Sequence, residues 1–240
     1  MTQAITPNRR IYDSEYVRHL FDNIAKRYDL LNHLLSLGFD FQWRRNTVDI
    51  LKKFNPSTIL DVATGTGDLA IIAAKLRPQK IIAIDPSYEM LKRAQEKIAR
   101  KDLSKTITLT SGVVENLQFE NNSFDAVMVA FGVRNFSDLK KGLKEILRVL
   151  KNDGIFIVLE FSQPKKFPIK QLYSFYSRHL IPPIGKLFSK NNEAYKYLPS
   201  TVSEFPDTNE FILVLREAGF RDIEGYPKTA GIVTIYKAQK

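Results

Sequence analysis

A turn built around two glycines constrains this chain more than any other feature of its sequence. An apolar run over residues 58–62 contains an acid, Asp61, and is followed by Gly65, Gly67 and a helical pattern. Glycines at these positions let the backbone turn tightly and approach a ligand, and they open a helix whose free N–H groups point at it. The pattern predicts a strand, a binding loop and a helix, as in nucleotide-binding α/β proteins.

The acids around this turn decide between two kinds of ligand. The glycine spacing, with the small residue Ala70 after it, also serves nicotinamide dinucleotides in dehydrogenases. However, Asp61 at the strand end and Asp68 on the first helical turn would both face a pyrophosphate of the same sign. S-adenosylmethionine (SAM) instead carries an ammonium and a sulfonium, which carboxylates attract. We therefore predict that the loop binds SAM.

A second apolar run, residues 81–84, ends in Asp85. The distance from the glycine turn is close to that of the ribose-binding acid in a βαβ unit. A carboxylate there can accept hydrogen bonds from both ribose hydroxyls, and we assign Asp85 this role. The alternative is that Asp85 caps the next helix, because Asp85-Pro86-Ser87 also has the form of a helix start.

Apolar runs and helical patterns alternate along most of the chain. A helical stretch from about 13 to 55 precedes the first strand. Further strands are expected at 107–110, 124–129 and 155–160, and helices from about 68, 88 and 137. This alternation predicts a mostly parallel sheet with right-handed crossovers. After residue 162 the pattern is helical and interrupted by prolines, and 220–226 and 232–238 are expected to pair antiparallel at the sheet edge.

The length of 240 residues suits one large domain with an ample core. We expect a single domain with an N-terminal helical lid (1–55), a SAM-binding core (56–162), a helical substrate cap (163–210) and a closing helix with edge strands (211–240). The absence of cysteine excludes disulfides, zinc–thiolate sites and thiol nucleophiles, and no metal site is expected. No signal peptide or membrane-spanning run is visible, so we expect a cytoplasmic protein.

The net charge of +10 favours anionic partners, either nucleic acid or acidic lipid headgroups. The sequence contains no separate basic module and no RNA-binding motif. It also lacks, after the fourth strand, the Asn-Pro-Pro-Tyr-type segment with which base-amino methyltransferases hold a flipped base. No nucleic-acid partner is therefore expected.

Several longer motifs resemble those of a known family. These are Asp-Val-Ala-Thr-Gly-Thr-Gly-Asp at 61–68, Phe-Gly-Val-Arg-Asn at 131–135 and Arg-Val-Leu-Lys-Asn-Asp-Gly at 148–154, with supporting segments at 21–32, 159–162 and 195–202. Together they resemble the class I SAM-dependent methyltransferases, and more narrowly the C-methyltransferases of menaquinone and ubiquinone biosynthesis. The resemblance runs from about Arg18 to the last strand.

The resemblance implies a Rossmann-like sheet of seven strands, six parallel and one reversed at the edge, with N-terminal helices and a helical insertion before the last two strands. It implies methyl transfer from SAM to a ring carbon of a demethylated polyprenyl quinol, with S-adenosylhomocysteine as product. Demethylmenaquinol is the favoured substrate. A ubiquinone precursor, another small molecule, and a non-catalytic SAM-binding subunit are the alternatives.

The resemblance also assigns cofactor contacts beyond Asp61, Gly65, Gly67 and Asp85. Thr66 would contact the methionine part of SAM, and Val113 and Val114 the adenine. Relatives usually have a polar or acidic residue followed by alanine at those two positions, so here contact through the Val114 backbone N–H is expected. Ala130 is a second departure, where a small hydroxyl residue is common.

Methylation of a ring carbon requires a quinol that has lost a hydroxyl proton, and a site shielded from water. Arg134, just past the carboxyl end of the fourth strand, could stabilise the oxyanion or orient a water, with Asn135 completing the hydrogen bonding. The alternative is that Arg134 pairs with a nearby carboxylate to hold the loop. Glu160, at the end of the fifth strand, is a candidate proton acceptor or a structural acid.

Other residues receive weaker predictions. His19, His33 and His179 lie in helical stretches with no partner acid at a telling spacing, and we expect helix-face positions for them. Tyr28 and Asp29 are expected to close the site over SAM, although a packing role is equally consistent for Tyr28.

The segment from 167 to 190 mixes aromatic and basic residues. Such a segment can close a substrate cavity, and it can also make weak contact with an anionic membrane surface. The two uses are compatible, because a polyprenyl quinol resides in a bilayer. We therefore expect peripheral association with the inner face of the cytoplasmic membrane. Whether the protein is a homodimer is left open.

Overall fold

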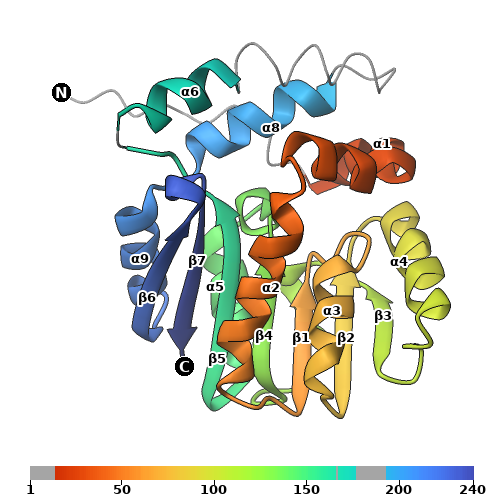
Figure 1. Cartoon of the computed structure of the whole chain (residues 1–240). Helices are drawn as coiled ribbons and strands as arrows, with labels where there is room; N and C mark the ends of the chain where they lie inside the picture. Colours follow the sequence, from red (N-terminus) through yellow and green to blue (C-terminus); the bar gives the residue numbers. More distant parts are fainter. Residues whose placement is uncertain (1–13, 166, 177–192) are drawn as a thin grey trace.

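The structure, a computed structural model, describes residues 14–165, 167–176 and 193–240. Its centre is one seven-stranded sheet in the order β3-β2-β1-β4-β5-β7-β6 (Figure 1). The strands are β1 (Thr58–Val62), β2 (Lys80–Asp85), β3 (Ile107–Ser111), β4 (Phe124–Ala130), β5 (Leu150–Phe161), β6 (Arg221–Lys228) and β7 (Val233–Gln239). This is the Rossmann-like sheet predicted from the sequence.

Strand β7 is the one reversed strand. It pairs antiparallel with both β5 and β6, whereas β1 to β5 pair in parallel. The expected antiparallel pair at the sheet edge is therefore confirmed. The reversed strand itself is second from the edge, because β6 lies outside it.

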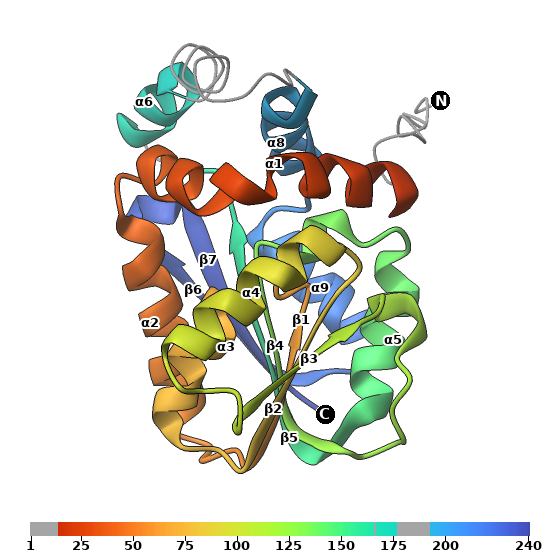
Figure 2. The same cartoon turned by 90° about the vertical axis from the view of Figure 1, so that its right-hand side faces the viewer.

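Helices cover both faces of the sheet, as Figures 1 and 2 show. One face is covered by α2 (Phe39–Lys52), α3 (Asp68–Ala73) and α4 (Tyr88–Arg100), and the other by α5 (Leu139–Val149) and α9 (Thr208–Glu217). Successive β1 residues point to opposite faces: Ile59 packs in the first layer and Leu60 in the second, both with 0% exposure. Burial on both faces explains why the strands are continuous apolar runs.

A third group of helices lies across the carboxyl ends of the parallel strands (Figures 1 and 2). It consists of α1 (Ser14–Leu35), α6 (Ile169–Phe175) and α8 (Glu193–Glu204). Val17, Leu20 and Leu31 of α1 form a small apolar cluster with Tyr197 of α8. The expected helical stretch 13–55 is divided at Leu37 and Gly38, both with positive φ. Of its two helices, α1 lies over the strand ends and α2 packs on the sheet.

Among the described residues, no helix combines the length and the apolarity that a membrane crossing requires.

Candidate active site

The glycine loop connects β1 to α3 in a conformation that favours glycine. Gly65 and Gly67 have φ of 56° and 81°, in the left-handed region, and Gly67 is the N-cap of α3. A Cβ on Gly67 would lie 3.2 Å from the Ala94 Cβ, so the loop packs closely on α4. The Gly65 N–H donates to Asp85 Oδ2 over 2.8 Å. The loop thereby closes onto the end of the neighbouring strand.

Asp85 lies at this strand end with both carboxylate oxygens hydrogen-bonded. Besides the Gly65 bond, Oδ1 accepts from the Ser87 N–H over 2.9 Å. The N-cap of α4 is Ser87, whose hydroxyl oxygen accepts from the Met90 N–H. The alternative that Asp85 itself caps this helix was therefore wrong. Burial raises the pKa of Asp85 to about 6.

Asp61 is buried beside it, with 1% of its surface exposed. Its Oδ2 accepts from the Thr64 hydroxyl over 2.6 Å, and the Ala70 N–H lies close enough to lower the pKa of the carboxyl, but no described group meets hydrogen-bonding geometry at the buried Oδ1. Burial raises the pKa of Asp61 to about 7, and the nearby Asp85 carboxylate adds to the shift. A cationic ligand would relieve this cost by pairing with the carboxylate.

Two pockets open at the strand ends. The larger, about 750 Å³ including space open to solvent, is lined by Gly65, Asp85, Val113, Val114 and Asn135 among others. The smaller lies on the other side of Ala63 and Gly65 and is lined by Tyr28, Arg44, Asp61, Thr66 and Asp68 among others. All the predicted cofactor residues except Gly67 line one of the two pockets. Arg134 and Glu160 line neither.

Arg134 and Glu160 form a buried ion pair behind the larger pocket. Arg134 Nη1 lies 2.8 Å from Glu160 Oε1, and their side chains are 5% and 0% exposed. Glu160 also accepts from the Arg134 and Phe161 N–H groups. This is the carboxylate pairing that the sequence left open as an alternative. Arg134 Nη1 further donates to the Phe131 carbonyl, and Nε has no partner among the described residues.

Asn135 faces the pocket. It follows Arg134 in the short 3-10 helix η3 (Val133–Asn135), and its Oδ1 accepts from the Tyr197 hydroxyl of α8 over 3.0 Å. Helix α8, which lies across the strand ends, is thus hydrogen-bonded directly to the loop after β4.

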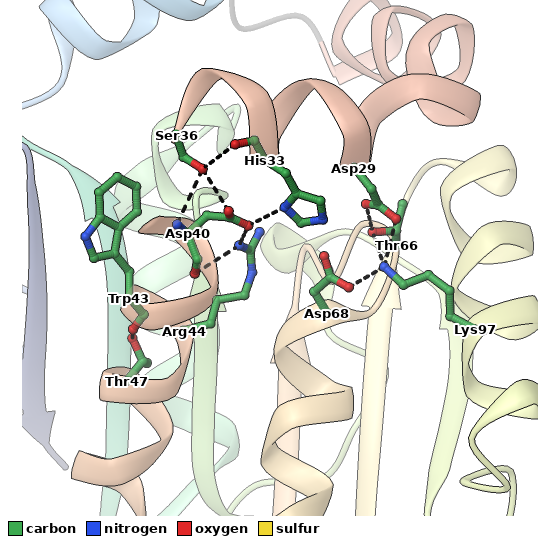
Figure 3. Close-up of polar contacts among 10 residues, drawn as sticks. All are labelled: Asp29, His33, Ser36, Asp40, Trp43, Arg44, Thr47, Thr66, Asp68 and Lys97. Carbon is green, nitrogen blue, oxygen red and sulfur yellow. Dashed lines mark hydrogen bonds and ion pairs between the residues drawn. The ribbon is translucent and has the colours of Figure 1, made fainter. Parts of the chain in front are cut away.

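Two aspartates of α1 hydrogen-bond to residues beneath the helix, one in the glycine loop and one at the start of α4. Asp22 accepts from the Ser87 hydroxyl over 2.5 Å, and Asp29 accepts from the Thr66 hydroxyl over 2.5 Å. Lys97 of α4 donates to Asp29 over 2.8 Å and also pairs with Asp68 (Figure 3). The single positive charge of Lys97 is therefore shared between Asp29 and Asp68, and Asp68 also lines the smaller pocket.

A second polar cluster lies where α1 turns into α2. Asp40 accepts from His33 Nδ1 over 2.8 Å, from the Ser36 hydroxyl over 2.7 Å and from Arg44 Nη1 over 2.7 Å (Figure 3). The expectation that His33 has no partner acid was wrong, because Asp40 lies across the helix–helix turn from it. His19 is exposed on α1, as expected, and His179 lies outside the described residues.

Sequence reasoning missed Asp22, Asp40, Arg44 and Lys97 as parts of the site. Asp22, Asp40 and Lys97 each hydrogen-bond to a residue of another helix or loop, whereas Arg44 pairs with Asp40 of its own helix α2. The segment 21–32, which resembles the family, was the one available signal for Asp22.

The arrangement fits SAM. Asp61 presents a buried oxygen with no partner in hydrogen-bonding geometry, and Asp85, Val113 and Val114 line the larger pocket, where the two valines are apolar. Burial also raises the pKa of Tyr28, although the Arg134 charge acts in the opposite direction. Tyr28 lines both pockets, consistent with its predicted position over the ligand.

Comparison with solved structures supports this fold. A SAM-dependent methyltransferase from Thermotoga maritima, described as a possible histamine N-methyltransferase, superposes with a TM-score of 0.64 over 93% of this chain and 99% of its own. At 20% identity the likeness concerns the fold alone.

Comparison with curated sequences gives nearer relatives. The demethylmenaquinone methyltransferase of Bacteroides fragilis is 47% identical over 95% of this chain and 93% of its own length. The ubiquinone/menaquinone biosynthesis C-methyltransferase UbiE of Geobacter sulfurreducens is 43% identical over 99% and 93%. The model of the ubiE/COQ5 methyltransferase family matches residues 9–240. The chain therefore belongs to the ubiE/COQ5 methyltransferase family.

Proposed function

We propose that this protein transfers the methyl group of SAM to a ring carbon of a demethylated polyprenyl quinol, converting demethylmenaquinol to menaquinol. The observation that carries the proposal is the pair of adjoining pockets at the carboxyl ends of the strands: Asp85 and Asn135 line the larger, Asp61 lines the smaller, and Gly65 lines both. The names of the two relatives support the substrate class. The second name also includes ubiquinone biosynthesis, so a ubiquinone precursor is the second candidate substrate.

The cofactor residues divide the ligand between the two pockets. Asp85 accepts from the ribose hydroxyls, and Val113 and Val114 hold the adenine in the larger pocket. Asp61 and Thr66 meet the methionine part in the smaller one, next to the glycine loop. When bound, SAM supplies an electrophilic methyl group on a sulfonium.

The remaining residues act on the quinol. Asn135 is placed to hydrogen-bond a quinol oxygen, because it lines the pocket. The Arg134 charge reaches Tyr28, which lines the pocket, since it lowers the pKa of Tyr28 against the raising effect of burial. The same field would stabilise a quinol oxyanion. Glu160 has both oxygens engaged, so it anchors Arg134, and water accepts the ring proton.

The substrate class is tested by incubating the protein with methyl-labelled SAM and a panel of demethylated quinols, followed by mass spectrometry. We expect the label on a ring carbon of menaquinol. Label on the ubiquinone precursor instead would select the second candidate. Binding of SAM without transfer to any quinol would contradict an enzymatic role.

The role of the Arg134–Glu160 pair can be separated from its contribution to stability. Removing Arg134 alone would leave Glu160 buried and unpaired, at a cost of about 3–5 kcal/mol. The double variant Arg134→Gln with Glu160→Gln removes both charges together and allows an amide–amide hydrogen bond. We expect this variant to fold and bind SAM normally, with turnover lowered about 10²–10³-fold. Turnover near that of the parent would show that the pair only holds the loop.

Cofactor binding should weaken as the pH falls through about 7 and 6. Both Asp61 and Asp85 have a pKa that is higher in the folded protein than in the unfolded chain. Their protonation therefore stabilises the ligand-free folded protein, fully below about pH 4, and this stabilisation is lost as the pH rises through about 6–7. A cationic ligand requires the ionised forms. The rise in melting temperature on adding SAM should therefore be larger at pH 8 than at pH 5.5. In Asp61→Asn the SAM-induced rise in melting temperature should no longer change near pH 7. If its dependence on pH is the same as in the parent protein, the proposed contact between Asp61 and SAM is wrong.

We further propose that the protein collects its substrate by weak, peripheral contact with the inner face of the cytoplasmic membrane. Three apolar side chains in or beside the helices over the strand ends are strongly exposed: Phe167 (81%), Leu172 (62%) and Leu37 (75%). The Tyr176 hydroxyl donates to the Leu35 carbonyl and so joins the end of α6 to α1. The rest of the segment 167–190, including Arg178, lies outside the described residues, as does Lys166.

Sedimentation with vesicles tests this contact. We expect binding to anionic vesicles, little to neutral ones, and release at about 0.5 M salt. Lys170→Glu with Leu172→Ser should reduce binding, whereas Lys105→Glu, at the opposite end of the sheet before β3, should not. No binding by the parent protein would remove the proposal.

A further inference from the structure

The smaller pocket beside the glycine loop contains charges of both signs. Asp61 provides a buried carboxylate, and Arg44 provides a guanidinium that is 6% exposed. The Arg44 charge lowers the pKa of Asp61 against the effect of burial, so the two groups act on each other. Of the described residues that line either pocket, Arg44 is the one lysine or arginine.

Arg44 uses only part of its hydrogen-bonding capacity within the protein. Nη1 donates to the Asp40 carboxylate over 2.7 Å and approaches the Asp40 carbonyl at 3.4 Å. No described residue accepts a hydrogen bond from Nη2 or Nε. Neither nitrogen is fully buried, so both can reach a ligand or solvent. A guanidinium has five N–H donors, and donors at a buried position need acceptors. Since Arg44 lines the smaller pocket, these donors are available to an acceptor that enters it.

The Arg44 side chain is held rigidly. Its Cζ lies 5.3 Å from the centre of the Phe131 ring, and its partner Asp40 is itself fixed by His33 and Ser36 (Figure 3). A carboxylate only accepts hydrogen bonds, so His33 Nδ1 carries the proton in this contact. Two donors besides Arg44 thus hold Asp40, which in turn orients Arg44. Such preorganisation lowers the entropic cost of binding a ligand.

Lys97, the other cation near the loop, is already engaged. It donates to Asp29, Asp68 and the Thr66 hydroxyl and lines neither pocket. A ligand acid that enters the smaller pocket would therefore meet Arg44. The methionine part of SAM carries one such acid, the α-carboxylate, next to its α-ammonium.

We propose that Arg44 binds the α-carboxylate of the cofactor's amino-acid part while Asp61 binds its α-ammonium, which makes the smaller pocket a zwitterion site. The inference rests on the proposed function, because it takes SAM as the cofactor. A guanidinium can present two parallel N–H groups to a carboxylate, which makes the contact strong and orients the ligand. Arg44 is then a specificity residue for ligands with an intact amino acid.

Calorimetry with two ligands tests the proposal without relying on turnover. S-adenosylhomocysteine has both charged groups, whereas its decarboxylated form, S-adenosyl-3-thiopropylamine, lacks only the carboxylate. In Arg44→Gln the affinity for S-adenosylhomocysteine should fall about 10- to 100-fold. The affinity for the decarboxylated ligand should change less than about twofold. Arg45→Gln removes the same charge from the exposed neighbouring position and should change neither affinity.

The remaining outcomes are distinct. An equal loss of affinity for both ligands in Arg44→Gln would show that Arg44 only supports the fold, and unchanged affinities for both ligands would show that it does not touch the carboxylate. Either overturns the inference. If Arg44→Gln does not fold, Arg44→Lys gives the same comparison, because it keeps the charge beside Asp40 but not the fork. A parent protein that binds neither ligand would instead contradict SAM as the cofactor.

Discussion

The hydrogen bond from the Gly65 N–H to Asp85 is the contact on which the site depends. It joins the loop after β1 to the end of β2 over 2.8 Å, and its donor Gly65 has a positive φ, which favours glycine at this position. Both pockets share this loop as a wall. The bond therefore sets the distance between the ribose end of the site and the methionine end.

The buried charges around this bond are arranged in three separate pairings. Arg134 pairs with Glu160 behind the larger pocket, Arg44 pairs with Asp40 beside the smaller one, and Lys97 pairs with Asp29 and Asp68 under α1. Among the described carboxylates, Asp61 is the one with a buried oxygen that has no partner in hydrogen-bonding geometry. Removing charges from water is costly unless they are paired, so this oxygen marks where a ligand cation contributes most.

The sheet and its glycine loop could be predicted because their signals are local. Apolar runs, glycines at fixed spacing and acids at strand ends all lie within a few residues of one another. The charge pairings could not be predicted in the same way. Lys97 and Asp29 are on different helices, and His33 meets Asp40 only because the chain turns at Leu37 and Gly38. Arg134 was expected either to act on substrate or to pair with an acid, and the pairing partner is Glu160 on the neighbouring strand β5.

The apolar cluster between α1 and α8 has a consequence for the order in which the protein is assembled. Val17, Leu20 and Leu31 come near the start of the chain, whereas their partner Tyr197 comes late. During synthesis from the amino end, α1 has no α8 to pack on until most of the chain has been made. Contacts between segments so distant also carry a large loop-closure entropy. Helix α1 is thus among the last of the described helices to complete its packing, after the sheet beneath it.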